Sequence, residues 1–232
     1  MIFLSKRPLF SLDERLALCA SFVRRGTRLA DIGTDHAYLP VWLAQNGMIL
    51  SAVASDVRQG PLENAKDNIR RFNVENTVTA VLSDGLDNIE PSQAQDIVIA
   101  GMGGELIAKI IDKPQWLCDG SRRLILQPMT RAESLRLFLC GKGFKTEQEK
   151  ACVSGGKTYS VMVCSYDGQV RECTDEFKYA GLLVNDSSPE AKRYIYCVNQ
   201  KLRKKLNAYS ENSAERAKLS LLIDKFDKII NT

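Results

Sequence analysis

Acidic side chains near the ends of three short apolar runs are the residues of this sequence best suited to hold a ligand. Asp31 lies near the end of the first run, Asp56 ends the second, and Asp84, followed by Gly85, ends the third. Gly33 permits a tight turn close to a ligand. Asp56 follows Gly33 at about the separation at which an acid binds the ribose hydroxyls of a nucleoside cofactor. Each residue alone is equally explained as a cap or a turn, but together they favour a nucleoside site.

The residues after Gly33 discriminate between cofactor types. A nicotinamide cofactor prefers the pattern G-x-G-x-x-G, but Asp35 and Tyr38 occupy the positions of the later glycines. An adenosyl cofactor without a pyrophosphate brings no anion to this loop, so the acid Asp35 is tolerated there. The sequence therefore favours S-adenosylmethionine over a dinucleotide.

The acids can be assigned to separate parts of that cofactor. Asp31 or Asp35 would pair with the methionine ammonium, Asp56 would bind the ribose, and Asp84 with Gly85 would border the adenine. Small residues after the fourth apolar run would expose backbone next to the methyl group, although a plain glycine turn explains them too. The predicted cofactor site also includes neighbours on the same loops: His36, Val57, Ala100, Gly101 and Met102. His36 could equally be a hydrogen-bonding residue of its loop.

Apolar runs that alternate with helical patterns would bring these residues together. The continuous apolar character of the runs is typical of strands covered on both faces, and ligands bind beyond the carboxyl ends of such strands. Five strands are predicted at 28–34, 49–56, 78–84, 96–102 and 122–128, with helices at 36–46, 61–73, 103–112 and 131–140. Two further runs, 144–154 and 157–166, flank a glycine pair and indicate a hairpin. We predict an α/β fold with a mostly parallel seven-stranded sheet, the plan of the Rossmann-like class I methyltransferases, although periodicity alone does not separate it from other doubly wound folds.

The last part of the chain has a different residue pattern from the rest. Apolar residues recur at helical spacing after Pro189 and again after residues 210–213, which predicts an antiparallel helical hairpin of coiled-coil type. We therefore divide the chain into a domain of residues 1–167 and a helical appendage of residues 168–232. The appendage has 12 lysines and arginines against 9 acids and is the more basic part.

Composition excludes several classes of protein. The chain has 232 residues, 44% hydrophobic and 26% charged, which fits a globular protein and not a disordered one. Seven scattered cysteines and one histidine form neither a zinc pattern nor a disulfide framework, so we expect buried free cysteines and no metal. No run is long enough to span a membrane, and we expect a cytoplasmic protein, with a monomer favoured.

Four sequence motifs resemble those of a known family. DIGTDHAYLP (31–40), SDVRQGPLENA (55–65), IAGMGGELI (99–107) and LILQPM (124–129) are similar, in the same order, to the motifs of bacterial tRNA (adenine-N1)-methyltransferases that modify adenine 22 of tRNA, the TrmK family. The resemblance covers nearly the whole chain, including a C-terminal coiled coil. It implies S-adenosylmethionine as methyl donor, bound by Gly33, Asp56, Asp84 and Gly85, and tRNA as acceptor.

The chemistry implied by this resemblance suggests further roles. Asp35 is the candidate catalytic carboxylate, which would take a proton from the adenine amine or stabilise its charge, and a cofactor contact or cap is about equally expected. Tyr38 could stack on the base or pack within the first helix. Gly103 would leave room for a flat substrate, and Gln127 could present its amide to the same cleft.

Basic residues would hold the tRNA phosphates. Lys6, Arg7 and Arg15 are expected near the mouth of the site, and Arg203, Lys204 and Lys205 form a cluster in the tail; a solvated helix face is the simpler explanation of such a cluster alone. Two other functions remain open: a small-molecule methyltransferase with the same cofactor, and a noncatalytic cofactor-binding protein whose helices dock a partner.

Overall fold

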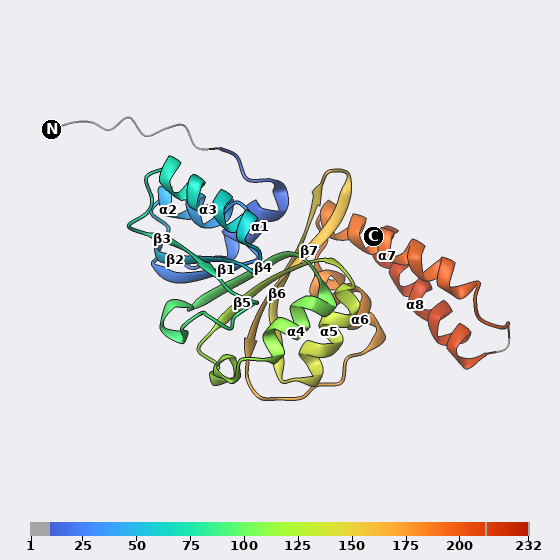
Figure 1. The fold of residues 1–232 in the computed structure, drawn as a ribbon. Helices are drawn as coiled ribbons and strands as arrows, with labels where there is room; N and C mark the ends of the chain where they lie inside the picture. The colour runs from blue at the N-terminus through green and yellow to red at the C-terminus, as the bar shows by residue number, and fades with distance from the viewer. Residues whose placement is uncertain (1–9, 212, 232) are drawn as a thin grey trace.

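A seven-stranded sheet forms the centre of the molecule (Figure 1). The computed structural model describes residues 10–211 and 213–231. The strands are β1 Thr27–Ile32, β2 Ile49–Asp56, β3 Val78–Leu82, β4 Asp96–Gly103, β5 Arg123–Thr130, β6 Phe144–Ser154 and β7 Lys157–Tyr166. Their order is β3-β2-β1-β4-β5-β7-β6, and β7 runs antiparallel to both of its neighbours. The predicted mostly parallel sheet and the closing hairpin are confirmed.

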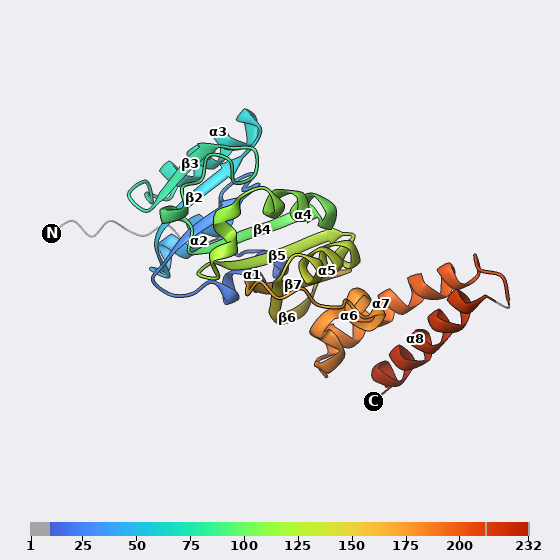
Figure 2. The ribbon, with the colours of Figure 1, turned by 90° about the horizontal axis from the view of Figure 1, so that it is seen from below.

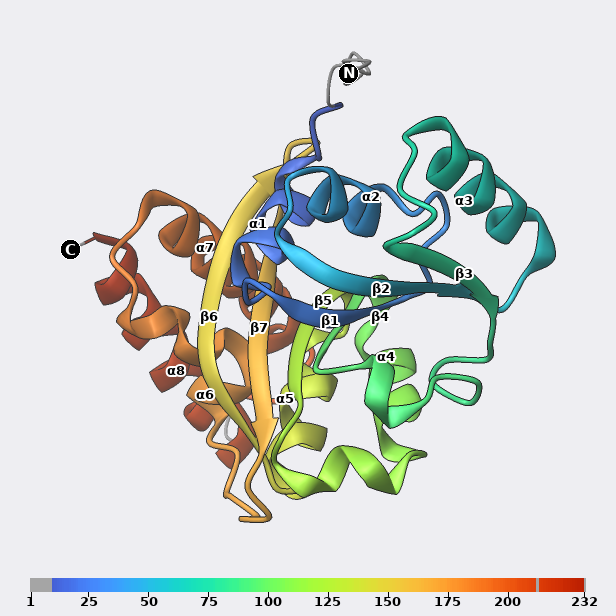
Figure 3. The same cartoon turned by 90° about the vertical axis from the view of Figure 1, so that its left-hand side faces the viewer.

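Helices cover both faces of the sheet, as the continuous apolar strands require. One face is covered by α1 Glu14–Phe22, α2 Tyr38–Gln45 and α3 Gln59–Arg71, and the other by α4 Gly104–Asp112 and α5 Ala132–Gly141 (Figures 1 and 3). Two separate clusters of buried side chains lie under these two layers. The helices therefore fix the strands from both sides and hold their carboxyl ends along one edge.

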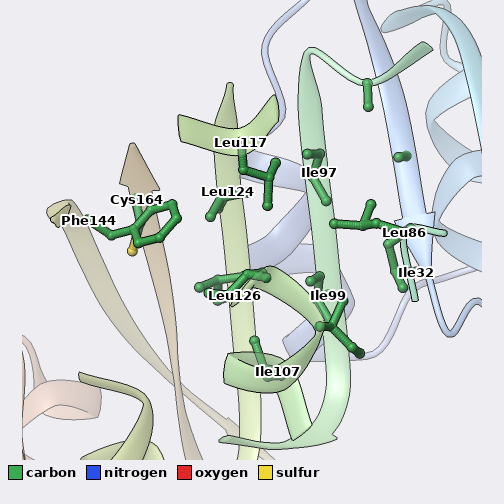
Figure 4. Packing of buried hydrophobic residues seen from close by; sticks show 14 of the residues in the cluster. Ile32, Leu86, Ile97, Ile99, Ile107, Leu117, Leu124, Leu126, Phe144 and Cys164 are labelled. Atoms are coloured by element: carbon green, nitrogen blue, oxygen red, sulfur yellow. The ribbon is translucent and has the colours of Figure 1, made fainter. Parts of the chain in front are cut away.

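The core under α4 and α5 shows how the apolar runs are used (Figure 4). Ile97 and Ile99 of β4 and Leu124 and Leu126 of β5 are at most 1% exposed, and Ile107 of α4 packs against them. Burying a side chain of this size contributes about 1.5–3 kcal/mol. The strands β4 and β5 are thereby held in register, with their ends side by side.

A third, separate cluster organises the C-terminal helices α6 Asp175–Ala180, α7 Pro189–Leu206 and α8 Ala214–Asn231. Ser188 caps the start of α7, because its hydroxyl accepts a hydrogen bond from the amide of Ala191 at 3.3 Å. The helices α7 and α8 lie side by side and extend away from the sheet (Figure 2). The predicted helical hairpin is confirmed, and its coiled-coil packing stays a prediction.

A buried ion pair joins these helices to the sheet. Arg136 of α5 donates from Nη2 to Glu149 Oε1 of β6 at 2.6 Å, and neither side chain is exposed. The same guanidinium donates to the backbone carbonyls of Lys178 at 3.1 Å and Tyr179 at 3.2 Å, and to the hydroxyl of Tyr194 at 3.2 Å. One side chain thus connects α5, β6, α6 and α7.

Several expectations differ from the structure. The short helices α1 and α6 were not predicted, and α2 begins at Tyr38 because the preceding residues form a loop with left-handed backbone. All seven cysteines are free, but Cys118 is exposed and Cys173 and Cys197 are half-buried, so the expectation of burial holds for four. Within the described residues, no helix combines the length and apolar character needed to cross a bilayer.

Candidate active site

A cavity of about 610 Å³ opens at the carboxyl ends of β1, β2, β3 and β4. Its volume is within the usual range for small-molecule sites. All the residues that the sequence assigned to the cofactor line it, namely Asp31, Gly33, Asp35, His36, Asp56, Val57, Asp84, Gly85, Ala100, Gly101 and Met102. The sheet therefore brings the predicted set together at one place, where α/β folds bind ligands.

The β1–α2 loop has an unusual backbone. Gly33, Asp35 and Ala37 have φ values of 74°, 53° and 54°, so every second residue is left-handed. A Cβ atom at Gly33 would lie 2.0 Å from Cε of Met102. Asp35 and Ala37 thus adopt the conformation that glycine would adopt without strain, which in other residues costs roughly 1–2 kcal/mol.

Asp31 is the buried acid of the cavity wall. It is 6% exposed, and its Oδ2 accepts a hydrogen bond from the Thr34 hydroxyl at 2.5 Å. Burial raises the pKa of Asp31 to about 6, and the hydrogen bond from Thr34 partly opposes the shift. A cation bound beside Asp31 would favour its ionised form.

Asp56 is held rigidly at the end of β2. It is 5% exposed, and its Oδ1 accepts a hydrogen bond from the backbone amide of Arg58 at 2.9 Å and lies 3.6 Å from Arg58 Nε. Both contacts involve the same carboxylate oxygen. Such a carboxylate can accept hydrogen bonds from ligand hydroxyls through its second oxygen.

Asp84 and Gly85 form the β3 side of the cavity. The Asp84 side chain is 70% exposed and lies 3.4 Å from Nζ of Lys113. Gly85 is left-handed, and a Cβ there would meet Ile110 at 3.0 Å. Gly85 therefore packs directly against Ile110, and a flat ring can lie against the surface that these two lining residues form, beside a carboxylate that accepts hydrogen bonds.

A hydrogen-bonded wall closes the β5 side of the cavity. Arg15 of α1 donates from Nη1 to Oε1 of Gln127 at 3.0 Å, and the amide of Gly101 donates to the same oxygen at 3.1 Å. The Gln127 amide nitrogen donates to the carbonyl of Pro128 at 3.0 Å. Gln127 is fully buried and does not line the cavity. Its predicted role of presenting an amide to substrate is replaced by a bracing role, because its polar atoms already have protein partners.

Tyr38 and His36 lie at the mouth of the cavity. Their rings stack with centroids 5.2 Å apart and planes 18° apart, and Phe10 packs against Tyr38 at 5.1 Å. His36 Nε2 lies 3.6 Å from Oδ2 of Asp35, whose side chain is 60% exposed. Tyr38 is 41% exposed, so part of its ring can contact another molecule. Gly103 lies in β4 just beyond the lining residues.

The predicted basic cluster of the tail does not line this cavity. Arg203 is paired with Asp227 of α8, Lys205 donates to the Tyr179 hydroxyl at 3.2 Å, and Lys204 is exposed. Arg15 does line it and pairs with Asp13 at 2.7 Å. Lys6 and Arg7 lie outside the described residues.

The charges of the lining favour a cationic ligand. The wall contains five aspartates and two arginines besides His36. Carboxylates in such a cavity attract an ammonium or sulfonium group and repel phosphate. Within the described residues, no group of three or more acidic, cysteine or histidine side chains could hold a metal ion.

Some lining residues were missed from the sequence. They are mostly apolar or come from the unpredicted α1 and the strand-end loops: Asp13, Leu16, Thr34, Leu39, Arg58, Ser83, Leu106 and Ile110. Asp13 caps α1 by accepting from the amide of Leu16 at 2.9 Å. An aspartate before an apolar helical pattern is a recognisable start signal, so this helix could have been found.

Comparisons with known proteins agree with this geometry. The family model described as a methyltransferase domain matches residues 12–162. A Bacillus subtilis protein named tRNA (adenine(22)-N(1))-methyltransferase is 29% identical over 224 residues, which cover 93% of this chain and 94% of the relative.

Solved structures extend the likeness to the C-terminal helices. A Streptococcus pneumoniae protein crystallised in complex with S-adenosyl-L-methionine is 33% identical, with a TM-score of 0.82 and coverage of 95% of this chain and 100% of that one. The structure of the B. subtilis M1A22 tRNA methyltransferase TrmK is 26% identical, with a TM-score of 0.81 and coverage of 96% and 100%. The chain therefore belongs to the methyltransferase-domain family, and within it to the tRNA (adenine(22)-N1)-methyltransferases.

Proposed function

We propose that the protein transfers a methyl group from S-adenosylmethionine to N1 of adenine 22 in tRNA. The observation that carries this proposal is the convergence of Asp31, Asp56 and Asp84 on one cavity at the carboxyl edge of the sheet. Membership of a family whose relatives are named for this reaction supports it. A small-molecule substrate would leave the helical tail, which the solved relatives share, without a use, and a noncatalytic role would not account for relatives that are named for methyl transfer to tRNA.

The cavity fits the cofactor on chemical grounds. Asp31 would pair with the methionine ammonium, Asp56 would accept hydrogen bonds from the ribose hydroxyls, and the adenine would lie against Gly85, beside Asp84. Gly33 allows the loop backbone to pack against the Met102 side chain, where a Cβ would collide with the Met102 methyl group. When bound, S-adenosylmethionine supplies a methyl group on a positively charged sulfur.

The protein's own contribution is positioning. The N1 lone pair of adenine attacks the methyl carbon as the bond to sulfur breaks, and the positive charge passes to the base until its amine loses a proton. Asp35, exposed at the mouth, would accept that proton or stabilise the charge. Tyr38 would stack on the incoming base, and Gly103 would leave room beside it.

The acceptor must enter the cavity unpaired. N1 lies on the Watson-Crick edge of adenine and is inaccessible in a paired stack, so the base must be extruded. We propose that residues 1–167 form the catalytic domain, that the coiled-coil appendage 168–232 contacts the tRNA, and that the protein acts as a cytoplasmic monomer. The basic character of the appendage supports its part in this division.

The test is methyl transfer itself. The full chain is incubated with labelled S-adenosylmethionine and unmodified tRNA transcript, and the labelled nucleoside is mapped. A single 1-methyladenosine at position 22 is expected, and it is lost from a transcript with guanosine there. Binding of S-adenosylhomocysteine without labelling of any tRNA would contradict the proposal.

A further inference from the structure

A second cavity, of about 640 Å³, lies between the end of β5, the start of α5 and helix α7. Nothing in the proposed methyl transfer so far uses it. Its wall includes residues 128–134, Thr158 and Tyr159 of β7, Lys178 and Tyr179 of α6, and one face of α7.

The charge of this wall is opposite to that of the first cavity. It contains four cations, Arg131, Lys178, Lys201 and Lys205, and one carboxylate, Glu133. The Lys205 ammonium donates to the Tyr179 hydroxyl, and Lys178 Nζ lies 5.3 Å from the centre of the same ring. Lysines with neutral partners keep their full charge for an external anion.

The basic residues of the tail lie on different sides of α7, and only some of them face the second cavity. Residues 194, 197, 198, 201 and 205 line the cavity and recur every three or four positions, so they share one side of the helix. Arg203 lies on another side and pairs with Asp227. Lys201 and Lys205 therefore line the second cavity. Arg203 does not line it, although it is close to Lys205 in the sequence.

The wall is built rigidly. Arg136, fully buried behind it, donates to the backbone carbonyls of Lys178 and Tyr179 and to the Tyr194 hydroxyl. Three lining residues from two helices are thus fixed by one guanidinium. A surface whose backbone is held in this way can bind an anion without first losing backbone freedom.

The two cavities share a wall. Met102 lines the first and Pro128 the second, and these residues are direct partners on the neighbouring strands β4 and β5, which lie about 5 Å apart. Arg15 lines the first cavity, lies 5.7 Å from the ring centre of Tyr159 in the second, and donates to Met129 Sδ at 3.6 Å.

We propose that the second cavity binds the sugar-phosphate backbone of the tRNA beside the nucleotide whose base enters the first cavity. This proposal rests on the proposed function and adds the place where the acceptor is held. An acidic cavity for a cationic cofactor next to a basic cavity for a polyanion keeps each ligand out of the other's site. The phosphates would contact Lys178, Lys201 and Lys205, and the exposed part of Tyr179 would contact a sugar or base.

The thiol of Cys197 can report whether the second cavity is occupied. Cys197 lines the second cavity and is half-buried, whereas Cys118 is exposed at the opposite end of β5. Wild-type protein is treated with N-ethylmaleimide, and alkylation of both cysteines is followed by peptide mass spectrometry. Saturating unmodified tRNA is expected to slow alkylation of Cys197 about fivefold or more and to leave Cys118 unchanged, and S-adenosylhomocysteine alone should protect neither. Equal alkylation of Cys197 with and without tRNA, or protection by poly-glutamate and not by tRNA, would overturn the proposal.

Charge reversal supplies an independent measurement. Lys201→Glu is expected to weaken tRNA binding about tenfold and to lower the slope of log Kd against log salt by about one, because one phosphate contact is lost. Arg193→Glu is the matched control, since Arg193 is exposed on the same helix and outside the cavity wall. It should change the affinity less than about twofold.

The two proposals fail differently. If wild-type protein methylates tRNA but Lys201→Glu binds it as Arg193→Glu does, the second cavity is not the tRNA site and the proposed function stands. If wild-type protein binds S-adenosylhomocysteine but methylates no tRNA, the proposed function fails. Lys201→Glu should keep its affinity for S-adenosylhomocysteine, which verifies that the variant is folded.

Discussion

At the scale of single residues, backbone conformation decides how the candidate catalytic acid can be tested. Asp35 is left-handed, with φ of 53°. Alanine at this position keeps the strain and loses the carboxylate's local interactions, so a loss of activity would not separate chemistry from loop distortion. Asparagine has nearly the same shape as aspartate and tolerates the left-handed region, so it removes the charge alone.

Asp35→Asn is therefore expected to lower kcat for tRNA methylation by roughly a hundredfold, the effect of losing a proton acceptor. Binding of S-adenosylhomocysteine should change little. Asp67→Asn, which alters an exposed acid of α3, is the matched control and should be neutral. Unchanged kcat with a weakened cofactor affinity would instead identify Asp35 as a cofactor ligand.

The raised pKa of Asp31 predicts a pH dependence of cofactor binding. Below about pH 6 the carboxyl group is protonated and cannot pair with the methionine ammonium, so affinity for S-adenosylhomocysteine should fall as pH drops through this value. Calorimetry between pH 5 and pH 8 measures this affinity. Asp31→Asn should bind S-adenosylhomocysteine weakly, with an affinity that does not change with pH. Without ligand the sign is reversed: the free energy of unfolding falls as pH rises from about 4 to about 6, because the unfolded chain ionises first. A wild-type affinity that is constant across this range would remove Asp31 from the ammonium site.

At the scale of elements, the sequence patterns predicted the strands but not the short helices α1 and α6. A continuous apolar run predicts β2 with the bounds that the structure has, because strands buried on both faces need such residues, and the glycine pair between two β-like stretches predicts β6 and β7 with their observed bounds. The helix α1 has only nine residues, of which two, Cys19 and Ala20, are buried, and its start is marked in the sequence by the single capping residue Asp13. The structure places the basic residues of the tail on different sides of α7, because neighbours in a helix point about 100° apart and only residues three or four apart share a face. The tRNA contact of Arg203, Lys204 and Lys205 stays a prediction.

The buried ion pair of Arg136 and Glu149 predicts a large loss of stability on breaking it. Arg136→Met leaves Glu149 charged and unpaired in the interior, which should lower the free energy of unfolding by about 3–5 kcal/mol in urea titrations. Lys66→Met, which breaks an exposed pair with Glu63, should cost less than about 1 kcal/mol. The double variant Arg136→Met with Glu149→Met should recover part of the stability and still show a raised KM for tRNA, because the carbonyls of Lys178 and Tyr179 lose their common donor. A double variant with normal KM would limit the pair to a structural role.

At the scale of the whole molecule, the two cavities separate the charges that the two ligands require. The family resemblance and the strand-end acids were sufficient to predict the first cavity. The second was not predictable, because its wall combines β5, α5, α6, α7 and β7 and depends on how the helical hairpin docks on the sheet.

This arrangement predicts different salt responses for the two ligands. Raising KCl from 50 to 300 mM should weaken tRNA binding by about one to three orders of magnitude, because phosphate contacts release counterions. Affinity for S-adenosylhomocysteine should change by less than about threefold, since its charges are held at short range inside the first cavity. Filter binding and calorimetry on the same preparation measure both. A tRNA affinity that is independent of salt would exclude a basic docking surface.

The order of the two cavities along the chain has a further consequence. Every lining residue of the first cavity lies between Asp13 and Ile110, whereas the second is complete only at Lys205. A ribosome translating this chain therefore releases every lining residue of the donor site well before the last lining residue of the acceptor groove. Mutation or exchange of the C-terminal helices can therefore change which RNA is bound without altering any lining residue of the cavity that holds the methyl donor.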